Sequence, residues 1–113
     1  MGKVTYIASR GDIVWIDFSP VKGHEQNGRR PVIILTPKEY NSKTRMALVC
    51  PLTKQVKGYP FEVVYTGKKV SGAVLVDQVR SVAFESRDTL FIEKADEGTV
   101  SEIKLKLLAL ISG

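Results

Sequence analysis

The residues that could do chemistry are densest in one short segment, KGHEQNGRRP (residues 22–31). Its glycines allow the backbone to bend closely around a ligand, and Pro31 biases Arg30 toward an extended backbone with a defined side-chain direction. A planar guanidinium can hold two phosphate oxygens at once. The segment therefore predicts an anion-binding loop. The alternative is that Arg29 or Arg30 forms an ion pair with Glu25 and only closes the loop.

A second candidate is Pro51-Leu52-Thr53-Lys54, followed by Lys57. Thr53 offers a hydroxyl donor just past a predicted strand break, and the two lysines add positive charge. Such a group suits a phosphate oxygen. The alternative is a threonine that satisfies its own backbone in a turn.

A third group of side chains could contact nucleic-acid bases. Asp77, Gln78 and Arg80 are base-reading types at the end of a predicted strand, although a solvated turn has the same composition. Four aromatic residues could stack on bases or fill the core: Tyr59, Phe61, Tyr65 and Phe84. Trp15 lies in the middle of a predicted strand, and we expect it to serve packing.

Several kinds of site are excluded by composition. His24 is the only histidine and Cys50 the only cysteine, so one chain can build neither a histidine-rich metal site nor an internal disulfide. Phosphate-loop, dinucleotide and zinc motifs are missing. Cys50 precedes Pro51 in a predicted strand, where a thiol would be buried and unreactive. We expect no metal and no cofactor.

The elements that must position these residues are mostly strands. Apolar or alternating runs predict strands at 12–18, 32–35, 46–50, 61–65, 73–76, 80–84 and 90–93. Pro51 should mark a bulge or a strand end. Residues 21–30 should form a loop, 38–44 a polar connection with room for one helical turn, and 67–72 a hairpin tip.

A helix should close the chain. Thr99-Val100-Ser101-Glu102 fits a capping box with Thr99 as the N-cap. Apolar residues then recur at three- and four-residue spacing and predict a core-facing stripe: Ile103, Leu107, Leu108, Leu110 and Ile111. The expected fold is mainly β, a small antiparallel sheet with a C-terminal α-helix.

Length and charge narrow the class of protein further. The 113 residues fit one domain, residues 1–113, and no apolar run reaches the roughly 20 residues that a membrane span needs. The first ten residues lack the apolar core of a secretory signal, so we expect a soluble cytoplasmic protein. Residues 1–80 carry thirteen basic and six acidic side chains, whereas residues 81–113 carry four and six. Such segregation is typical of a phosphate-backbone binder, or of a solvated surface.

Several motifs, taken together and in order, resemble the MazF/PemK toxins of bacterial type II toxin–antitoxin modules. They are RGDIVWIDFSP (10–20), GHEQ (23–26) running into Arg30-Pro31, PLT (51–53), KGYPFEV (57–63) and DQVRS (77–81). The resemblance extends from Arg10 to the closing helix. It implies the partly open, barrel-like antiparallel sheet of the CcdB/Kid/MazF toxin type.

The resemblance also implies an activity and partners. Members of this family are homodimeric, metal-independent endoribonucleases that cut single-stranded RNA at short sequences, and an antitoxin with an acidic flexible tail neutralises them. On this chain the family's arginine corresponds to Arg30, its threonine to Thr53 and its acidic loop residue to Glu25. RNA-binding residues are expected around them: Lys22, His24, Gln26, Arg29, Lys54, Lys57, Asp77, Gln78 and Arg80. Arg29 and Lys54 depart from some relatives, so the reaction carries over but the recognition sequence does not.

Two other functions remain open at this stage. A CcdB-type inhibitor would bind gyrase through an aromatic carboxyl end, whereas this sequence ends in Leu110-Ile111-Ser112-Gly113. A non-catalytic RNA-binding module would stack bases without cutting the chain.

Overall fold

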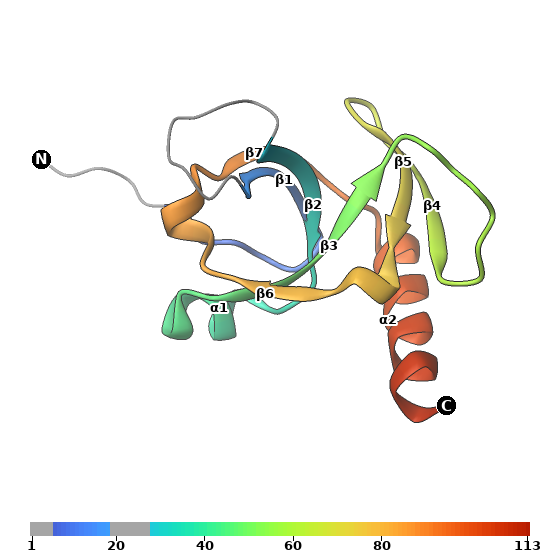
Figure 1. Ribbon diagram of the computed structural model, residues 1–113. Helices are drawn as coiled ribbons and strands as arrows, with labels where there is room; N and C mark the ends of the chain where they lie inside the picture. Colours follow the sequence, from blue (N-terminus) through green and yellow to red (C-terminus); the bar gives the residue numbers. More distant parts are fainter. Residues whose placement is uncertain (1–5, 19–27) are drawn as a thin grey trace, which may run out of the picture.

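The computed structural model describes residues 6–18 and 28–113 (Figure 1). Within these residues the chain forms, in order, β1 (Asp12–Asp17), β2 (Arg29–Ile34), α1 (Lys38–Thr44), β3 (Ala47–Thr53), β4 (Glu62–Thr66), β5 (Ser71–Leu75), the 3₁₀ turn η2 (Val76–Gln78), β6 (Arg80–Val82), the 3₁₀ turn η3 (Phe84–Arg87), β7 (Leu90–Lys94) and α2 (Glu97–Ser112). The predicted mainly β fold with a closing C-terminal helix is confirmed.

All strand pairs are antiparallel, and the sheet order is β4-β5-β3-β2-β1-β7, with β6 also paired to β3. The sheet curls on itself (Figure 1), and β3 is the strand that joins its two parts. The first half of β3 pairs with β6, and its last residues pair with β5. The end of β3 therefore lies where the two parts of the sheet meet.

The prediction that Pro51 ends or bulges the third strand is wrong. β3 continues through Pro51, which lies opposite Val32 of β2. On its other side β3 pairs with β6 only as far as Val49 and with β5 only from Leu52. Proline lacks the N–H that a second neighbour would need, and Pro51 falls at the change of partner, where no such bond is required.

The core lies on both faces of the central strands. One buried cluster contains Ile13, Ile33 and Cys50, and α2 adds Ile103 to it. The other contains Val14 and the ring of Phe84. Neighbouring residues of β1 thus point into different clusters, as expected for a strand buried on both sides.

Other element boundaries differ from the sequence prediction. Residues 38–44 form a seven-residue helix, α1, rather than a single turn. The predicted strand 80–84 ends at Val82, and the chain then turns through η3. Arg29 and Arg30, expected in a loop, are the first residues of β2. The two arginines extend β2 because they pair with the last residues of β1, Arg30 with Ile16 and Arg29 with Asp17.

The cap of α2 is Asp96, and the prediction of Thr99 as the N-cap is wrong. The Asp96 carboxylate accepts hydrogen bonds from the Thr99 backbone N–H at 3.0 Å and from the Thr99 hydroxyl at 2.7 Å. Aspartate caps helices as well as threonine does, so the helix begins three residues earlier than expected. Glu102 instead lies 3.9 Å from Lys106, one turn further on.

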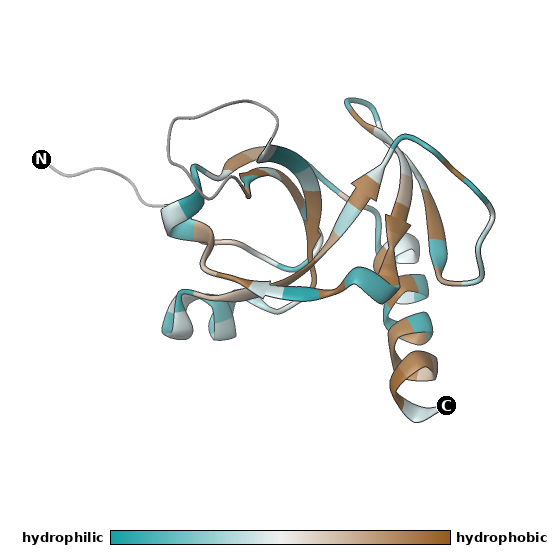
Figure 2. Cartoon of the chain, viewed as in Figure 1, coloured by the Kyte–Doolittle hydropathy of each residue, from teal (hydrophilic) through white to brown (hydrophobic). Residues whose placement is uncertain are grey.

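The apolar stripe of α2 is only partly buried. Ile103 is fully buried and Leu107 packs against the core, but the C-terminal half of the helix extends past the sheet (Figure 1). That half is mostly apolar (Figure 2). The exposed fraction is 68% for Leu105, 58% for Leu108 and 74% for Ile111. The predicted core role is therefore wrong for Leu108, Leu110 and Ile111. In the part of the chain described, no helix combines the length and hydrophobicity needed to cross a bilayer.

We predict that Asp96→Ala lowers the free energy of unfolding by about 1 kcal/mol at pH 7, the usual value of a side-chain cap. The hydrogen bonds from the Thr99 hydroxyl and backbone N–H lower the pKa of Asp96 in the folded protein. The contribution is thus present above the unfolded pKa of about 3.9 and is lost as the pH falls through the folded value.

Urea unfolding at pH 7 and at pH 3 measures this effect. The difference in unfolding free energy between the wild-type protein and Asp96→Ala should narrow in acid. Asp96→Asn keeps an acceptor without a titrating group, so its difference in unfolding free energy from Asp96→Ala should be the same at both pH values. An equal difference between the wild-type protein and Asp96→Ala at both pH values would contradict the assignment.

Candidate active site

Arg30 and Thr53, the two residues singled out for chemistry, lie on neighbouring strands. β2 and β3 are antiparallel with Val32 opposite Pro51. The same register continued by two residues sets Arg30 across from Thr53, at the beginning of β2 and the end of β3. Both side chains line one hollow of about 680 Å³.

This hollow, the arginine groove, is strongly cationic. Its lining residues are Trp15, Arg29, Arg30, Pro31, Pro51, Leu52, Thr53, Lys54, Lys69, Val70, Ser71, Leu75 and Gln78. Four of these described residues carry positive charge, and none of them is acidic. A concave surface of one sign concentrates ligands of the other, so the groove suits a polyanion.

Trp15 belongs to this groove, and its assignment to packing is wrong. It pairs with Pro31 across β1 and β2 and is 37% exposed. Indole is too large to be fully buried in most sheets, and here it presents part of its surface to the groove. The size of the tryptophan side chain was the feature of the sequence that could have indicated this partial exposure.

The position of Thr53 depends on a close approach by β5. Gly72, with φ of +155°, lies so near that a Cβ there would stand 2.1 Å from the Thr53 carbonyl oxygen. Only glycine fits this contact. The Thr53 hydroxyl accepts a hydrogen bond from the Gln55 backbone N–H at 3.2 Å. That bond uses an acceptor lone pair, and the hydroxyl hydrogen stays available to a ligand.

A second hollow of about 400 Å³, the Tyr59 hollow, adjoins the arginine groove. It is lined by Thr53, Gln55, Lys57, Tyr59, Pro60, Phe61, Glu62, Leu75, Asp77 and Gln78. Thr53, Leu75 and Gln78 line both hollows. The predicted site residues Lys57, Asp77 and Gln78 are thus brought to the same surface as Arg30.

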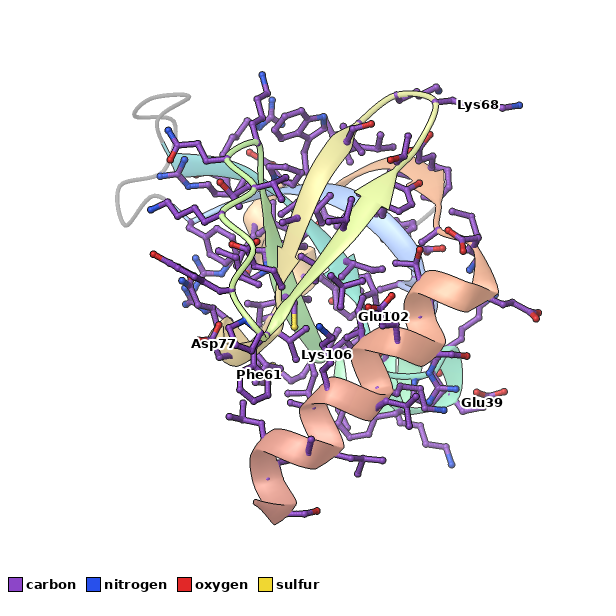
Figure 3. All side chains as sticks on the ribbon, turned by 90° about the vertical axis from the view of Figure 1, so that its right-hand side faces the viewer. Glu39, Phe61, Lys68, Asp77, Glu102 and Lys106 are labelled. Atoms are coloured by element: carbon purple, nitrogen blue, oxygen red, sulfur yellow. The ribbon has the colours of Figure 1, made fainter. Side chains whose placement is uncertain are left out.

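The wall of the Tyr59 hollow is held by two side chains that the sequence analysis missed. The buried carboxylate of Glu62 accepts hydrogen bonds from the backbone N–H groups of Lys57 at 3.1 Å and Gly58 at 2.9 Å. Lys106 of α2 donates to the carbonyl oxygens of Pro60 at 2.7 Å and Glu62 at 3.1 Å. Figure 3 shows Lys106 on the side of α2 that faces this segment. The alternation of apolar and polar residues along this strand did not predict that Glu62 would be buried.

Arg80 lies elsewhere. It is on β6 opposite Val49, and its guanidinium sits over the Phe18 ring at 4.6 Å, with Arg87 over the same ring at 5.8 Å. It lines neither the arginine groove nor the Tyr59 hollow. Four further predicted site residues lie outside the described residues, and so does the alternative Glu25 ion pair: Lys22, His24, Glu25 and Gln26.

Cys50 is buried in β3, as predicted. Burial, with a smaller effect from Asp77, raises the pKa of its thiol to about 12. The thiol stays protonated at neutral pH and is no nucleophile. Among the residues described, no group of three or more histidine, cysteine, aspartate or glutamate side chains is placed to hold a metal ion.

Comparison with known proteins places the chain among toxins. The model of the family "PemK-like, MazF-like toxin of type II toxin-antitoxin system" matches residues 9–111. The chain belongs to this family. It is 46% identical over 103 residues to the endoribonuclease toxin MazF of Escherichia coli strain K12, which covers 91% of this chain and 88% of that protein. It is also 31% identical over 108 residues to the endoribonuclease PemK of E. coli, covering 91% of this chain and 81% of that protein.

Solved structures of the MazF/PemK family agree. A crystal structure of MazF from Deinococcus radiodurans superposes with a TM-score of 0.84 at 40% identity, covering 96% of this chain and 99% of that one. A MazE–MazF structure from the same organism superposes with a TM-score of 0.83 at 36% identity, covering 94% of this chain and 96% of that one. The family resemblance and the partly open, barrel-like MazF-type fold predicted from the motifs are confirmed.

Proposed function

We propose that the arginine groove is where this chain, an endoribonuclease toxin of the MazF/PemK family, binds and cuts single-stranded RNA. The observation that carries the proposal is the placement of Arg30 and Thr53 at adjoining strand ends in one cationic groove. A guanidinium and a hydroxyl there can hold one phosphate from two directions.

The reaction uses the RNA's own nucleophile. The 2′-oxygen attacks the adjacent phosphorus, the bond from phosphorus to the 5′-oxygen breaks, and the products are a 2′,3′-cyclic phosphate and a free 5′-hydroxyl. The 2′-hydroxyl gives up its proton to a base, and the leaving 5′-oxygen takes up a proton from an acid. This chemistry needs no metal.

Arg30 stabilises the charge that develops on the phosphorane, because its fixed fork meets two oxygens at once. A guanidinium holds only donors and keeps its charge in proteins, so Arg30 serves as a donor to the leaving oxygen rather than as a base. Thr53 donates its hydroxyl hydrogen to a non-bridging oxygen. Both side chains reach the groove from strands rather than loops, so little ordering is needed on binding.

Glu25 is assigned as the base or, alternatively, as the group that orients an arginine, since nearby positive charge would weaken it as a base. His24 is a second proton carrier of lower rank. The remaining contacts to RNA are assigned to Lys22, Gln26, Arg29, Lys54, Lys57, Asp77, Gln78 and Arg80. Arg80 would meet RNA that continues beyond the groove, because it lies outside both hollows.

The partners proposed are a second copy of the chain and an antitoxin whose acidic tail occupies the groove. Leu105, Leu108 and Ile111 expose apolar surface on one helix, and such patches mark interfaces. The MazE–MazF structures of Deinococcus radiodurans support an antitoxin partner. Residues 1–113 act as a single domain, and the cytoplasm, where messenger RNA is translated, is the proposed compartment.

The family match favours RNA cleavage over gyrase inhibition of the CcdB type. A non-catalytic RNA-binding module is distinguished from the nuclease by experiment.

We predict that an RNA oligonucleotide containing the cut site is cleaved in the presence of EDTA to a cyclic phosphate and a 5′-hydroxyl, identified by mass spectrometry. The same oligonucleotide with a single 2′-deoxy nucleotide on the 5′ side of the cut should bind and remain whole.

Cleavage of the deoxy-substituted strand would eliminate the 2′-hydroxyl mechanism. If both strands bind and both survive, the chain is a binding module. Intact RNA together with inhibited gyrase would support the CcdB-type function instead.

We predict that Arg30→Lys lowers kcat by at least about 100-fold, the scale of losing one preorganised donor, because lysine keeps the charge but loses the fork. Single-turnover cleavage of a defined RNA measures the loss, and filter binding measures retained affinity. The neighbouring Arg29→Lys is the matched control and should cost less. Near-normal turnover in Arg30→Lys would reduce Arg30 to a phosphate anchor.

We predict that the purified protein has the mass of two 12.5 kDa chains by light scattering. The double variant Leu108→Glu, Ile111→Glu should move it to the mass of one chain, because it puts charge on the exposed face of α2. Tyr40→Glu, at a 44% exposed position on α1, is the control. A monomeric wild-type protein would contradict the homodimer. A double variant that remains dimeric would show that the dimer interface does not include the exposed face of α2.

A further inference from the structure

We propose that the Tyr59 hollow binds the nucleobase next to the cleaved phosphate and that Asp77 makes it select a base with an exocyclic amine and reject uracil. The inference rests on the proposed function, since it needs RNA in the arginine groove. It adds a pocket for one base and a rule for which bases fit.

The location follows from the shared wall. Thr53, Leu75 and Gln78 line both hollows, so a phosphate held at Thr53 lies at the entrance to the Tyr59 hollow. A base is separated from its phosphate by one ribose. The base on one side of a phosphate at Thr53 therefore reaches this hollow before any other, and a volume of about 400 Å³ is in the range of small-molecule sites.

The hollow offers a stacking surface. Tyr59 is 60% exposed, and the Lys57 ammonium lies 5.9 Å from its ring centre. Two other aromatic candidates, Tyr65 and Phe84, are buried in the core instead. A base that stacks on Tyr59 would gain affinity whatever its identity, because every base has a π-face.

Selectivity comes from the polar edge. Asp77 is exposed in η2, and its carboxylate forms no hydrogen bond or ion pair with the other described residues. Figure 3 shows Asp77 and Phe61 at the same end of the molecule, and both line the hollow. Gln78 beside Asp77 can both donate and accept.

An ionised carboxylate only accepts hydrogen bonds. Adenine, cytosine and guanine each present an exocyclic amine, whereas uracil presents two carbonyl oxygens flanking one N–H. Uracil can therefore offer the carboxylate only its N3–H, and the two oxygens beside that N–H face the carboxylate with like partial charge. A site whose polar group is well paired by one base and poorly paired by another discriminates between them.

The pocket is rigid enough to discriminate. Glu62 holds the N–H groups of Lys57 and Gly58, while Lys106 holds the carbonyl groups of Pro60 and Glu62. Tyr59 thus stands in a segment fixed on both sides by charged side chains. A base entering the hollow meets a formed surface and need not order it, which preserves the energy difference between bases.

The experiment compares cytosine with uracil, which share a ring size but differ at this edge in two groups. Cytosine presents a 4-amino donor beside an N3 acceptor, and uracil presents a 4-oxo acceptor beside an N3–H donor. The cut site is first mapped on a long defined RNA. Oligonucleotides carrying C or U at each of the two positions that flank the cut are then cleaved by the wild-type protein, and kcat/KM is measured for each. We expect one position at which C is preferred by about 10-fold or more.

Four variants assign the preference. Asp77→Asn, which adds a donor for uracil, should bring the C-to-U ratio at that position close to one. Tyr59→Ala should lower kcat/KM by about 10-fold for both bases, and Tyr59→Phe should restore it because the ring alone stacks. Tyr40→Ala removes an exposed tyrosine outside both hollows and should change neither quantity. Circular dichroism confirms that each variant is folded.

The outcomes separate the two proposals. If the wild-type protein cuts no RNA, the proposed function and this inference both fall. If it cuts RNA but shows no preference for C over U at either position, or keeps the preference in Asp77→Asn, the nuclease stands and the base pocket is wrong. A Tyr59→Ala variant as active as Tyr40→Ala would likewise overturn the stacking role.

Discussion

The antiparallel pairing of β2 with β3 is the constraint on which the candidate site depends. Val32, Ile33 and Ile34 are buried, and so are Val49 and Cys50 opposite them. A slip of one residue would turn every side chain to the other face, and both faces are filled by separate clusters. Packing therefore fixes the register. Arg30 comes just before the apolar run of β2 and Thr53 just after that of β3, so the same register brings the two polar residues together.

The groove that these strand ends form is cationic and open to solvent. Because it is open, the repulsion between its like charges destabilises the free protein only slightly. Arg30 and Lys54 are exposed, and Arg29 is half-buried. Water and salt screen charges that are this accessible, so their mutual repulsion costs little in the free protein. A bound phosphate chain replaces that screening and releases its own counterions. The same arrangement therefore keeps the empty groove stable and makes RNA affinity strongly dependent on salt.

The strands, the closing helix and the main site residues could be predicted because they follow from local signals. Apolar runs gave the central strands, and the order of motifs gave the family. The features that were missed depend on contacts distant in sequence or on a choice between equal local signals. Glu62 is buried because it binds the amides of Lys57 and Gly58, which strand alternation does not encode. Pro51 is tolerated because β3 changes partner there. Asp96 and Thr99 both fit a cap, and only the structure distinguishes them.

The contacts that hold the Tyr59 hollow are made to backbone atoms. Glu62 accepts from two amide groups, and Lys106 donates to two carbonyl groups. Bonds to the backbone do not depend on which side chains the segment carries, apart from proline at a donor position. The residues that face a bound base, among them Lys57 and Tyr59, can therefore change while the wall of the hollow stays in place. On this arrangement the stability of the fold and the choice of base are set by different residues, so the recognition sequence can diverge within a common scaffold.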